Sequence, residues 1–389
     1  MSTPSAAAVL VVDDVPENRD LLVRRLQRLG ISEIEQASNG IEALAAIERR
    51  NFDLVLLDIM MPELDGFGVL ERLKANGRVN DLPIVVISAL NEIEPVVRCI
   101  ELGAEDFIFK PFNPTLLRAR VMASLEKKGL RDRTRDELRR KQMELGEARM
   151  LQLALVPPPL RDSIGGRTAA IDVVLEPAQE IGGDLVDHFR IGEDLLVISL
   201  GDVSDKGAGA ALMMARTHSL VRGLAARPDA AALFREPEKA TALVNATLAS
   251  GNHAGMFVTF LLGTVDFTAG RLRYVRAGHV PPYLRRRDGS VERLGQHGGP
   301  PLGFTEDAVY KPADTAFGAG DAILVLTDGF TEAADPAGEL FGDDRVASYM
   351  THANPRDPDL LPTLVRQVRD FEAGRPPSDD MAALMLALG

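Results

Sequence analysis

The chain has 389 residues, enough for two or three domains, and its 46% hydrophobic and 26% charged residues are ordinary for a soluble globular protein. A net charge of −13 and the lack of Trp argue against a nucleic-acid partner, because phosphates bind to clustered cations and bases stack on aromatic rings. No apolar run reaches the roughly 18–20 residues of a membrane span, and no signal-peptide pattern opens the sequence. Together with a single cysteine, Cys99, these features lead us to expect a cytoplasmic protein with no membrane partner.

Residues 8–125 alternate short apolar runs with segments of helical period. This alternation predicts an α/β fold with a five-stranded, doubly wound parallel sheet, whose site lies where the strands end. Asp13, Asp14, Asp58, Ser88 and Lys110 stand at or just after the expected strand ends. Three carboxylates can hold Mg²⁺, one of them can accept a phosphoryl group, and the hydroxyl and the ammonium can bind its oxygens.

The motifs of this segment resemble those of response-regulator receiver domains. They are VVDD at Val11–Asp14, LLDIMMPELDG at Leu56–Gly66, ISA at Ile87–Ala89 and GAEDFIFKPF at Gly103–Phe112. The resemblance implies a flavodoxin-like strand order of 2-1-3-4-5 and phosphorylation of Asp58 by a histidine kinase. It also implies a Mg²⁺ site of Asp13, Asp14, Asp58 and the Met60 carbonyl, phosphoryl contacts from Ser88 and Lys110, and a switch position at Phe107.

Residues 126–156 contain no proline and are rich in residues that favour helix, and Pro157-Pro158-Pro159 end the segment. Leu138, Leu145 and either Leu151 or Gln152 lie near a seven-residue spacing, which is a weak heptad pattern. Two interpretations remain open. The segment is either a solvated connecting helix or a coiled coil that joins two chains into a homodimer.

Residues 180–207 predict a β-hairpin. Apolar runs at 185–191 and 195–200 flank a turn at Gly192-Glu193-Asp194. Folding about this turn places Asp184 opposite Asp202 on antiparallel strands, where directly opposed Cβ atoms are about 4.5–5.5 Å apart. Two carboxylates at this separation repel each other unless a proton or a cation lies between them.

The whole of residues 157–389 reads as short strands with hairpin turns and a few amphipathic helices, which predicts an α+β sandwich of antiparallel sheets flanked by helices. Asp328 follows one expected strand, and Asp379-Asp380 precedes the last. Together with Asp184 and Asp202 they make four carboxylate positions that can hold two divalent cations. His279 lies in a motif-like AGHVPP segment, where we favour a structural role over a catalytic one.

Residues 150–389 resemble the SpoIIE-type branch of the PPM (type 2C-like) metal-dependent Ser/Thr phosphatases. The matching motifs are EIGGD at Glu180–Asp184, GDVSDKG at Gly201–Gly207, AGHVPPYL at Ala277–Leu284, PPLG at Pro300–Gly303, LTDGFTEA at Leu326–Ala333 and SDDMAAL at Ser378–Leu384. One departure is Asp205, which stands where glycine is commoner in the family.

The resemblance implies a set of ligands for two Mn²⁺ or Mg²⁺ ions: Asp184, Asp202, the Val203 carbonyl, Asp328 and Asp379. Motif alignment favours Asp379 over Asp380 as the last ligand. The reaction implied is direct attack of a metal-activated water on phosphorus, without a covalent enzyme intermediate.

These observations predict a receiver domain at 1–125, a helical linker at 126–156 and a phosphatase domain at 157–389. The function expected from both resemblances is a response regulator of a stress-response type, in which phosphorylated Asp58 controls a phosphoserine/phosphothreonine protein phosphatase. Its implied substrate is a phosphorylated anti-sigma factor antagonist. The alternative is a non-catalytic adaptor or scaffold that binds a sigma-factor regulatory partner, although such a protein has no need of four carboxylate ligands.

Overall fold

The structure, a computed structural model, describes residues 7–89, 93–111, 113–295 and 297–389. The chain forms two compact units, Met1–Lys141 and Gln142–Gly389, and each is described here by itself. Within the described ranges, no helix combines the length and the apolar character that a membrane crossing requires.

The first unit is a five-stranded parallel sheet with the order β2-β1-β3-β4-β5, as predicted. Side chains of α1 and α5 are buried on one face of the sheet, and those of α2, α3 and α4 on the other. The strands are β1 (Ala8–Val12), β2 (Glu33–Ala37), β3 (Leu54–Asp58), β4 (Ile84–Ser88) and β5 (Asp106–Phe109). The helices are α1 (Pro16–Arg28), α2 (Gly40–Arg49), α3 (Gly66–Ala75), α4 (Ile93–Glu101) and α5 (Pro114–Leu153), and a short 3₁₀ turn, η2, spans Arg78–Asn80.

Every residue of β1, β3 and β4 is buried, which is the consequence of a sheet covered on both faces. Caps position the helices: the side chain of Asn39 accepts a hydrogen bond at the start of α2, and that of Asp65 does so at the start of α3. Gly66 allows α3 to approach the end of β3, because a Cβ atom there would lie 2.4 Å from the Asp58 carbonyl oxygen. The start of α3 is thus held close to Asp58 at the carboxyl end of β3.

Helix α5 is continuous over 40 residues, in agreement with the expected linker helix. Leu117 and Val121 in its first part are buried in the core of the first unit, and Arg131 forms an ion pair with Glu105. Farther along, Leu138 and Leu151 are more than half exposed in this single chain. The helix ends before Pro157, as the sequence predicts.

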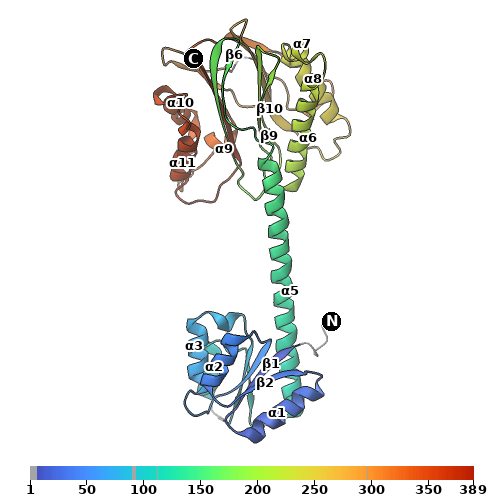
Figure 1. Cartoon of the computed structure of the whole chain (residues 1–389), viewed down its shortest axis with the longest axis vertical. Helices are drawn as coiled ribbons and strands as arrows, with labels where there is room; N and C mark the ends of the chain where they lie inside the picture. The colour runs from blue at the N-terminus through green and yellow to red at the C-terminus, as the bar shows by residue number, and fades with distance from the viewer. Residues whose placement is uncertain (1–6, 90–92, 112, 296) are drawn as a thin grey trace. The chain divides into compact units, whose positions relative to one another are not determined.

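The second unit is a sandwich of two sheets, one with the order β14-β11-β10-β9-β8 and one with the order β13-β12-β15-β16-β7-β6. Helices α6 and α8 pack on the first sheet, and α9, α10 and α11 on the second, with the sheets between these layers (Figure 1). The strands of this unit are β6 (Leu160–Ile164), β7 (Arg167–Glu176), β8 (Leu185–Ile191), β9 (Leu195–Val203), β10 (Val258–Asp266), β11 (Arg271–Ala277), β12 (Tyr283–Arg285), β13 (Val291–Arg293), β14 (Ala313–Ala316), β15 (Ala322–Leu326) and β16 (Met381–Leu388). Its helices are α6 (Ala208–Ala225), α7 (Ala230–Phe234), α8 (Pro237–Ala249), α9 (Asp328–Thr331), α10 (Gly342–His352) and α11 (Leu360–Glu372).

The main core of the second unit lies between the two sheets, where Ile198 and Leu261 of one sheet meet Val325 and Leu384 of the other. The predicted α+β sandwich is therefore confirmed. The expected hairpin is present as β8 and β9, and the expected helices are α6, α8, α10 and α11. The sequence analysis missed the hairpin of β6 and β7, because no polar and apolar alternation marks those strands clearly.

Candidate functional site

The first site lies at the carboxyl ends of the strands of the first unit. The carboxylate oxygens of Asp13, Asp14 and Asp58 come within 4.8 Å of one another. The ammonium group of Lys110 joins two of them, with Nζ at 2.7 Å from Asp13 Oδ2 and at 2.6 Å from Asp58 Oδ2. The structure thus brings together four of the residues that the sequence singled out.

Charge in this site is only partly balanced. Burial raises the pKa of Asp58, and the Lys110 hydrogen bond offsets part of that rise. Burial opposes the charge of Lys110 as well, but its hydrogen bonds to Asp13 and Asp58 raise its pKa overall, so it remains protonated. Three carboxylates against one ammonium leave an excess of negative charge, and this donor set fits a hard divalent cation such as Mg²⁺.

The remaining predicted residues of the first unit lie on β4, on β5 and in the segment after β3. Ser88 is buried at the end of β4, next to the strand that ends with Asp58. The Met60 N–H points to Asp58 Oδ1 at 3.4 Å, while the Met60 side chain is exposed. Phe107 is half-buried on β5 and makes an edge-to-face contact with Phe109, with ring centroids 5.1 Å apart.

The second site is built on the β8–β9 hairpin. Leu185 pairs with Gly201 at the end of the antiparallel register, so the next step along the register sets Asp184 opposite Asp202. Asp184 is fully buried, whereas Asp202 is partly exposed. The predicted opposition of these two carboxylates is therefore what the hairpin register produces.

Two further segments bring carboxylates to the same place. Asp328 opens α9 directly after β15, and Asp379 lies just before β16, which is the neighbour of β15 in the sheet. Thr327 donates a hydrogen bond from Oγ1 to Asp184 Oδ2 at 2.8 Å and thereby links these segments to the hairpin. Val203, the fifth predicted ligand, is buried at the end of β9.

The electrostatics of this cluster favour a bound cation. Burial raises the pKa of Asp202 to about 7, and repulsion from Asp328 and Asp379 adds to the rise. Burial first, and then the charge of Asp202, raise the pKa of Asp184 well above its ordinary value. Burial likewise raises the pKa of Asp328. Carboxylates that resist ionisation next to one another are a donor set that fits divalent cations, which relieve the repulsion.

Asp379 and Asp380 differ in what their oxygens do. Both oxygens of Asp380 accept backbone N–H groups, Oδ1 from Ala178 at 2.7 Å and Oδ2 from Gly183 at 2.6 Å. The Asp379 side chain is 42% exposed and forms an ion pair with Lys206. Asp380 is thus used to hold the segment before Asp184, and Asp379 is the residue of the two with a carboxylate at the open side of the cluster.

Several residues in or next to the cluster were missed by the sequence analysis. Gln152, in the last turn of α5, is buried and hydrogen-bonds both polar groups of the Gly182 backbone, donating to the carbonyl at 2.9 Å and accepting from the N–H at 3.1 Å. Thr327 and Lys206 were also missed. Thr327 and Lys206 lie inside the quoted motifs and could have been considered there. Gln152 could have been noticed because it is an uncharged polar residue in a helix that is rich in charged residues.

His279 is buried between the two sheets, where its Nδ1 lies 3.1 Å from Thr259 Oγ1. Burial lowers the pKa of His279 to about 3, so the ring is neutral, with a single N–H, near neutral pH. This environment agrees with the structural role favoured from the sequence.

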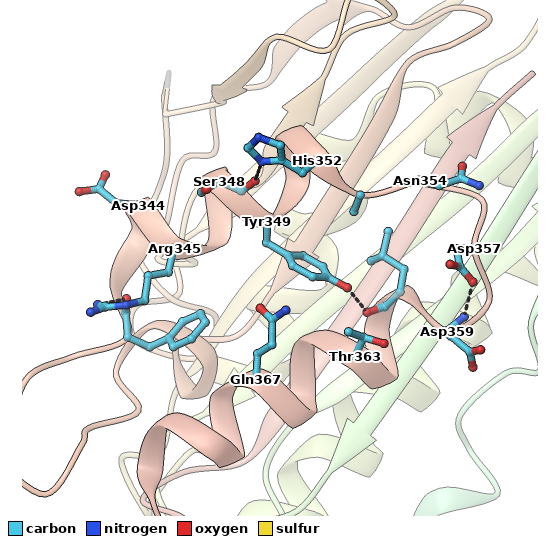
Figure 2. Close-up of a pocket in the computed structure, with 13 residues that line it drawn as sticks. Asp344, Arg345, Ser348, Tyr349, His352, Asn354, Asp357, Asp359, Thr363 and Gln367 are labelled. Atoms are coloured by element: carbon cyan, nitrogen blue, oxygen red, sulfur yellow. Dashed lines mark hydrogen bonds between the residues drawn. The ribbon is translucent and has the colours of Figure 1, made fainter.

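A separate pocket of about 690 Å³ lies between α10 and α11 (Figure 2). Arg345 and Tyr349 face it, but their polar groups are engaged locally: Arg345 donates to the Leu340 and Phe341 carbonyls, and Tyr349 donates to the Leu360 carbonyl. The pocket contains none of the predicted site residues.

Comparison with known proteins agrees with this arrangement. Residues 192–389 match the family described as Stage II sporulation protein E (SpoIIE), and residues 9–122 match the response regulator receiver domain. The chain is similar to Protein IcfG of Synechocystis sp., with 30% identity over 230 residues that cover 54% of this chain and 36% of that protein. It is also similar to the probable transcriptional regulator ycf27 of Cyanidium caldarium, with 40% identity over 119 residues that cover 31% of this chain and 46% of that protein.

The chain therefore spans less than half the length of either of these relatives. Among solved structures, the SiaA-PP2C domain of Pseudomonas aeruginosa resembles the second unit in fold, with a TM-score of 0.55 and 20% identity over 64% of this chain and 98% of that one. A match over half of the chain, on the unit that carries the four-carboxylate cluster, shows that this protein belongs to the SpoIIE family, with a response-regulator receiver domain ahead of its PPM phosphatase domain.

Proposed function

We propose that this protein is a phosphoserine/phosphothreonine protein phosphatase whose activity is set by phosphorylation of Asp58 by a histidine kinase. The observation that carries the proposal is the cluster of Asp184, Asp202, Asp328 and Asp379, in which burial first and then mutual repulsion raise the pKa values of three members. An adaptor has no use for such a cluster, since an unneutralised group of carboxylates lowers the stability of the fold.

In the receiver, Asp13, Asp14, Asp58 and the Met60 carbonyl would hold Mg²⁺. Asp58 supplies the nucleophilic oxygen, and its buried carboxylate is held by Lys110, which also contacts Asp13. The ammonium group of Lys110 and the hydroxyl of Ser88 bind the transferred phosphoryl oxygens. Phe107 then reports the change through its packing, because it has no hydroxyl group that could form a hydrogen bond.

In the phosphatase domain, which we assign to residues 157–389, Asp184, Asp202, Asp328, Asp379 and the Val203 carbonyl would hold two Mn²⁺ or Mg²⁺ ions. When bound, such a pair lowers the pKa of water and polarises a phosphoryl oxygen. The chain's own residues provide the rest. Thr327 fixes the Asp184 carboxylate, and Asp380 fixes the Gly183 N–H, so that the oxygen donors keep their orientation through turnover.

The substrate that we propose is a phosphorylated anti-sigma factor antagonist, and it is supported by the family of the second unit. We further propose that the protein acts in the cytoplasm and that residues 126–156 join two copies through the exposed apolar positions of α5, such as Leu138 and Leu151. In this arrangement residues 1–125 form the receiver and residues 126–156 convey its state.

The proposal is tested by turnover of a phosphoserine peptide by the full chain with Mn²⁺. Asp202→Ala should lower turnover by about 100-fold or more, because even the outer contacts of metal ligands are worth about 10- to 100-fold. Asp229→Ala, which removes a fully exposed carboxylate paired with Arg227, is the matched control and should leave turnover unchanged. A folded wild-type protein that binds Mn²⁺ and hydrolyses neither this peptide nor a phosphorylated antagonist would favour the adaptor.

A further inference from the structure

Lys206 lies in the turn between β9 and α6 and reaches across to the segment before β16. Its Nζ is 3.2 Å from Asp379 Oδ1 and also donates a hydrogen bond to the Ser378 carbonyl. The two contacts are made to consecutive residues of a segment that is 172 residues away in sequence. The ammonium group is therefore placed at the carboxylate cluster by the tertiary fold.

The turn that carries Lys206 is held on both sides. Asp205 has a φ of 151°, in a region that favours glycine, and its N–H donates to the Val203 carbonyl at 2.8 Å. Asp205 Oδ1 accepts the Lys206 N–H at 2.8 Å. Ser204 exchanges hydrogen bonds with the backbone of Phe257, donating its N–H and accepting at Oγ. A backbone fastened in this way keeps the Lys206 side chain within reach of the cluster.

Lys206 supplies a positive charge to the four-carboxylate cluster. In the part of the chain that the structure describes, no other ion pair involves Asp184, Asp202, Asp328 or Asp379. The Lys206 and Asp379 side chains are 43% and 42% exposed, so the pair is open to water and easily exchanged. A divalent cation attracts a carboxylate more strongly than an ammonium group does. Binding of such a cation by Asp379 would release the Lys206 ammonium from this carboxylate and leave it next to the site, still held by the Ser378 carbonyl.

We propose that Lys206 changes partner during the catalytic cycle: it neutralises Asp379 until a divalent cation binds there, and then binds the phosphoryl oxygens of the substrate. The inference rests on the proposed phosphatase function. The positive charge of Lys206 thus has one role before the cation binds and another role after it binds. It limits the repulsion in the cluster before the cation arrives, and it adds a positive charge for the substrate dianion afterwards.

The test compares Lys206→Met and Lys206→Arg with a matched control in the full chain. The control, Lys239→Met, removes the same charge from α8, where Lys239 is exposed and pairs with Glu236. Mn²⁺ affinity is measured without substrate by the electron paramagnetic resonance signal of free Mn²⁺. The affinity for inorganic phosphate is measured on the Mn²⁺-loaded protein by calorimetry, so that neither measurement depends on turnover.

Lys206→Met should bind Mn²⁺ about fivefold more tightly, the scale of an exposed ion pair that no longer competes. The same variant should bind inorganic phosphate about tenfold more weakly, because a charge-assisted hydrogen bond is lost. Lys206→Arg and Lys239→Met should remain close to wild type in both measurements. Tighter Mn²⁺ binding without weaker phosphate binding would overturn the exchange, and so would an unchanged Mn²⁺ affinity.

Failure of the inference about Lys206 can be distinguished from failure of the proposed phosphatase function. If Asp202→Ala loses the Mn²⁺ that the wild-type protein binds in its second unit, the metal site stands whatever the lysine variants do. If the wild type binds no Mn²⁺ in unit 2, the proposed function itself fails. A role of Lys206 limited to stability would lower the melting temperature of Lys206→Met without the opposite changes in Mn²⁺ and phosphate affinity, which also overturns the inference.

Discussion

At the scale of single residues, the two adjacent aspartates before β16 have opposite environments. Asp380 accepts two backbone N–H groups with its two oxygens, whereas Asp379 stands at the open side of the cluster. Identical side chains next to each other in sequence are thus expected to contribute to different properties, one to folding and the other to metal affinity.

We predict that Asp380→Asn lowers the free energy of unfolding by about 1–3 kcal/mol, because the amide has one acceptor oxygen and its NH₂ group faces a backbone donor. Asp379→Asn should leave the stability of the metal-free protein nearly unchanged and weaken Mn²⁺ binding. Urea unfolding in the presence of a chelator and Mn²⁺ titration separate the two effects. The assignment is wrong if Asp380→Asn is the variant that loses Mn²⁺ while keeping its stability.

The raised pKa of Asp202 makes the metal-free protein sensitive to pH. A carboxyl whose pKa rises from 3.8 to about 7 on folding binds its proton more tightly in the folded state, so its stabilising effect is present at low pH and is lost as the pH rises through about 7. We expect the melting temperature of the second unit in chelator to fall by several degrees as the pH rises from 3.8 to about 7. The expected size follows because about 1 kcal/mol corresponds to about 2–4 °C in a domain of this size. Calorimetry should show a smaller fall in Asp202→Asn, and an equal fall in both proteins would contradict the prediction.

At the scale of elements, the end of α5 is a structural part of the second unit. The Gln152 amide satisfies both polar groups of the Gly182 backbone, two residues before the buried Asp184. After the helix, Leu155 packs against the core beneath α6 and α8, and Val156 packs against the core between the sheets. Movement of the last turn of α5 therefore acts directly on the segment that carries a proposed metal ligand.

We predict that Gln152→Ala lowers the stability of unit 2 by about 1–3 kcal/mol, because it leaves a buried N–H and a buried carbonyl without their partner. It should also weaken Mn²⁺ binding through the loosened Gly182–Asp184 segment. Gln142→Ala, an exposed glutamine on the same helix, is the matched control for the change in helix propensity. Calorimetry and Mn²⁺ titration measure both effects, and equal behaviour of the two variants would remove α5 from the metal site.

At the scale of the whole molecule, one helix belongs to both units. Leu117 and Val121 near its start are buried in the receiver, and Gln152 near its end is buried in the phosphatase domain. A continuous helix transmits rotation between its ends, because its hydrogen bonds fix about 100° per residue. The phase of α5 is thus the property through which we expect phosphorylation of Asp58 to reach the cluster.

We predict that the phosphoryl mimic beryllofluoride changes the turnover of the full chain and that Asp58→Asn abolishes this response. Insertion of seven residues between Lys141 and Gln142 should preserve the response, because it returns the helix to within about 20° of its phase. Insertion of two residues should abolish it through a rotation of about 200°. Turnover of a phosphoserine peptide is the measurement, and an equal response in both insertion variants would show that helix phase carries no information.

Much of the fold and part of the site follow from local sequence. The five α/β repeats, the long helix and the β8–β9 hairpin are readable because hydrophobic period and turn residues act over a few positions. The opposition of Asp184 and Asp202 follows from the same local register. Strand β7 escaped detection because its residues show no clear alternation, although it pairs with both β6 and the distant β16.

What the sequence alone determined is the set of chemical groups: two families of motifs, their carboxylates, and the helix between them. The tertiary structure decided which of these groups are engaged and which are open. Asp380 meets Gly183 across 197 residues, Thr327 meets Asp184 across 143, and Lys206 meets Ser378 across 172. Such contacts carry no local pattern, because they arise when separate sheets and turns pack together. The free oxygens of the cluster, its resident lysine and its link to α5 therefore became visible only in the folded chain.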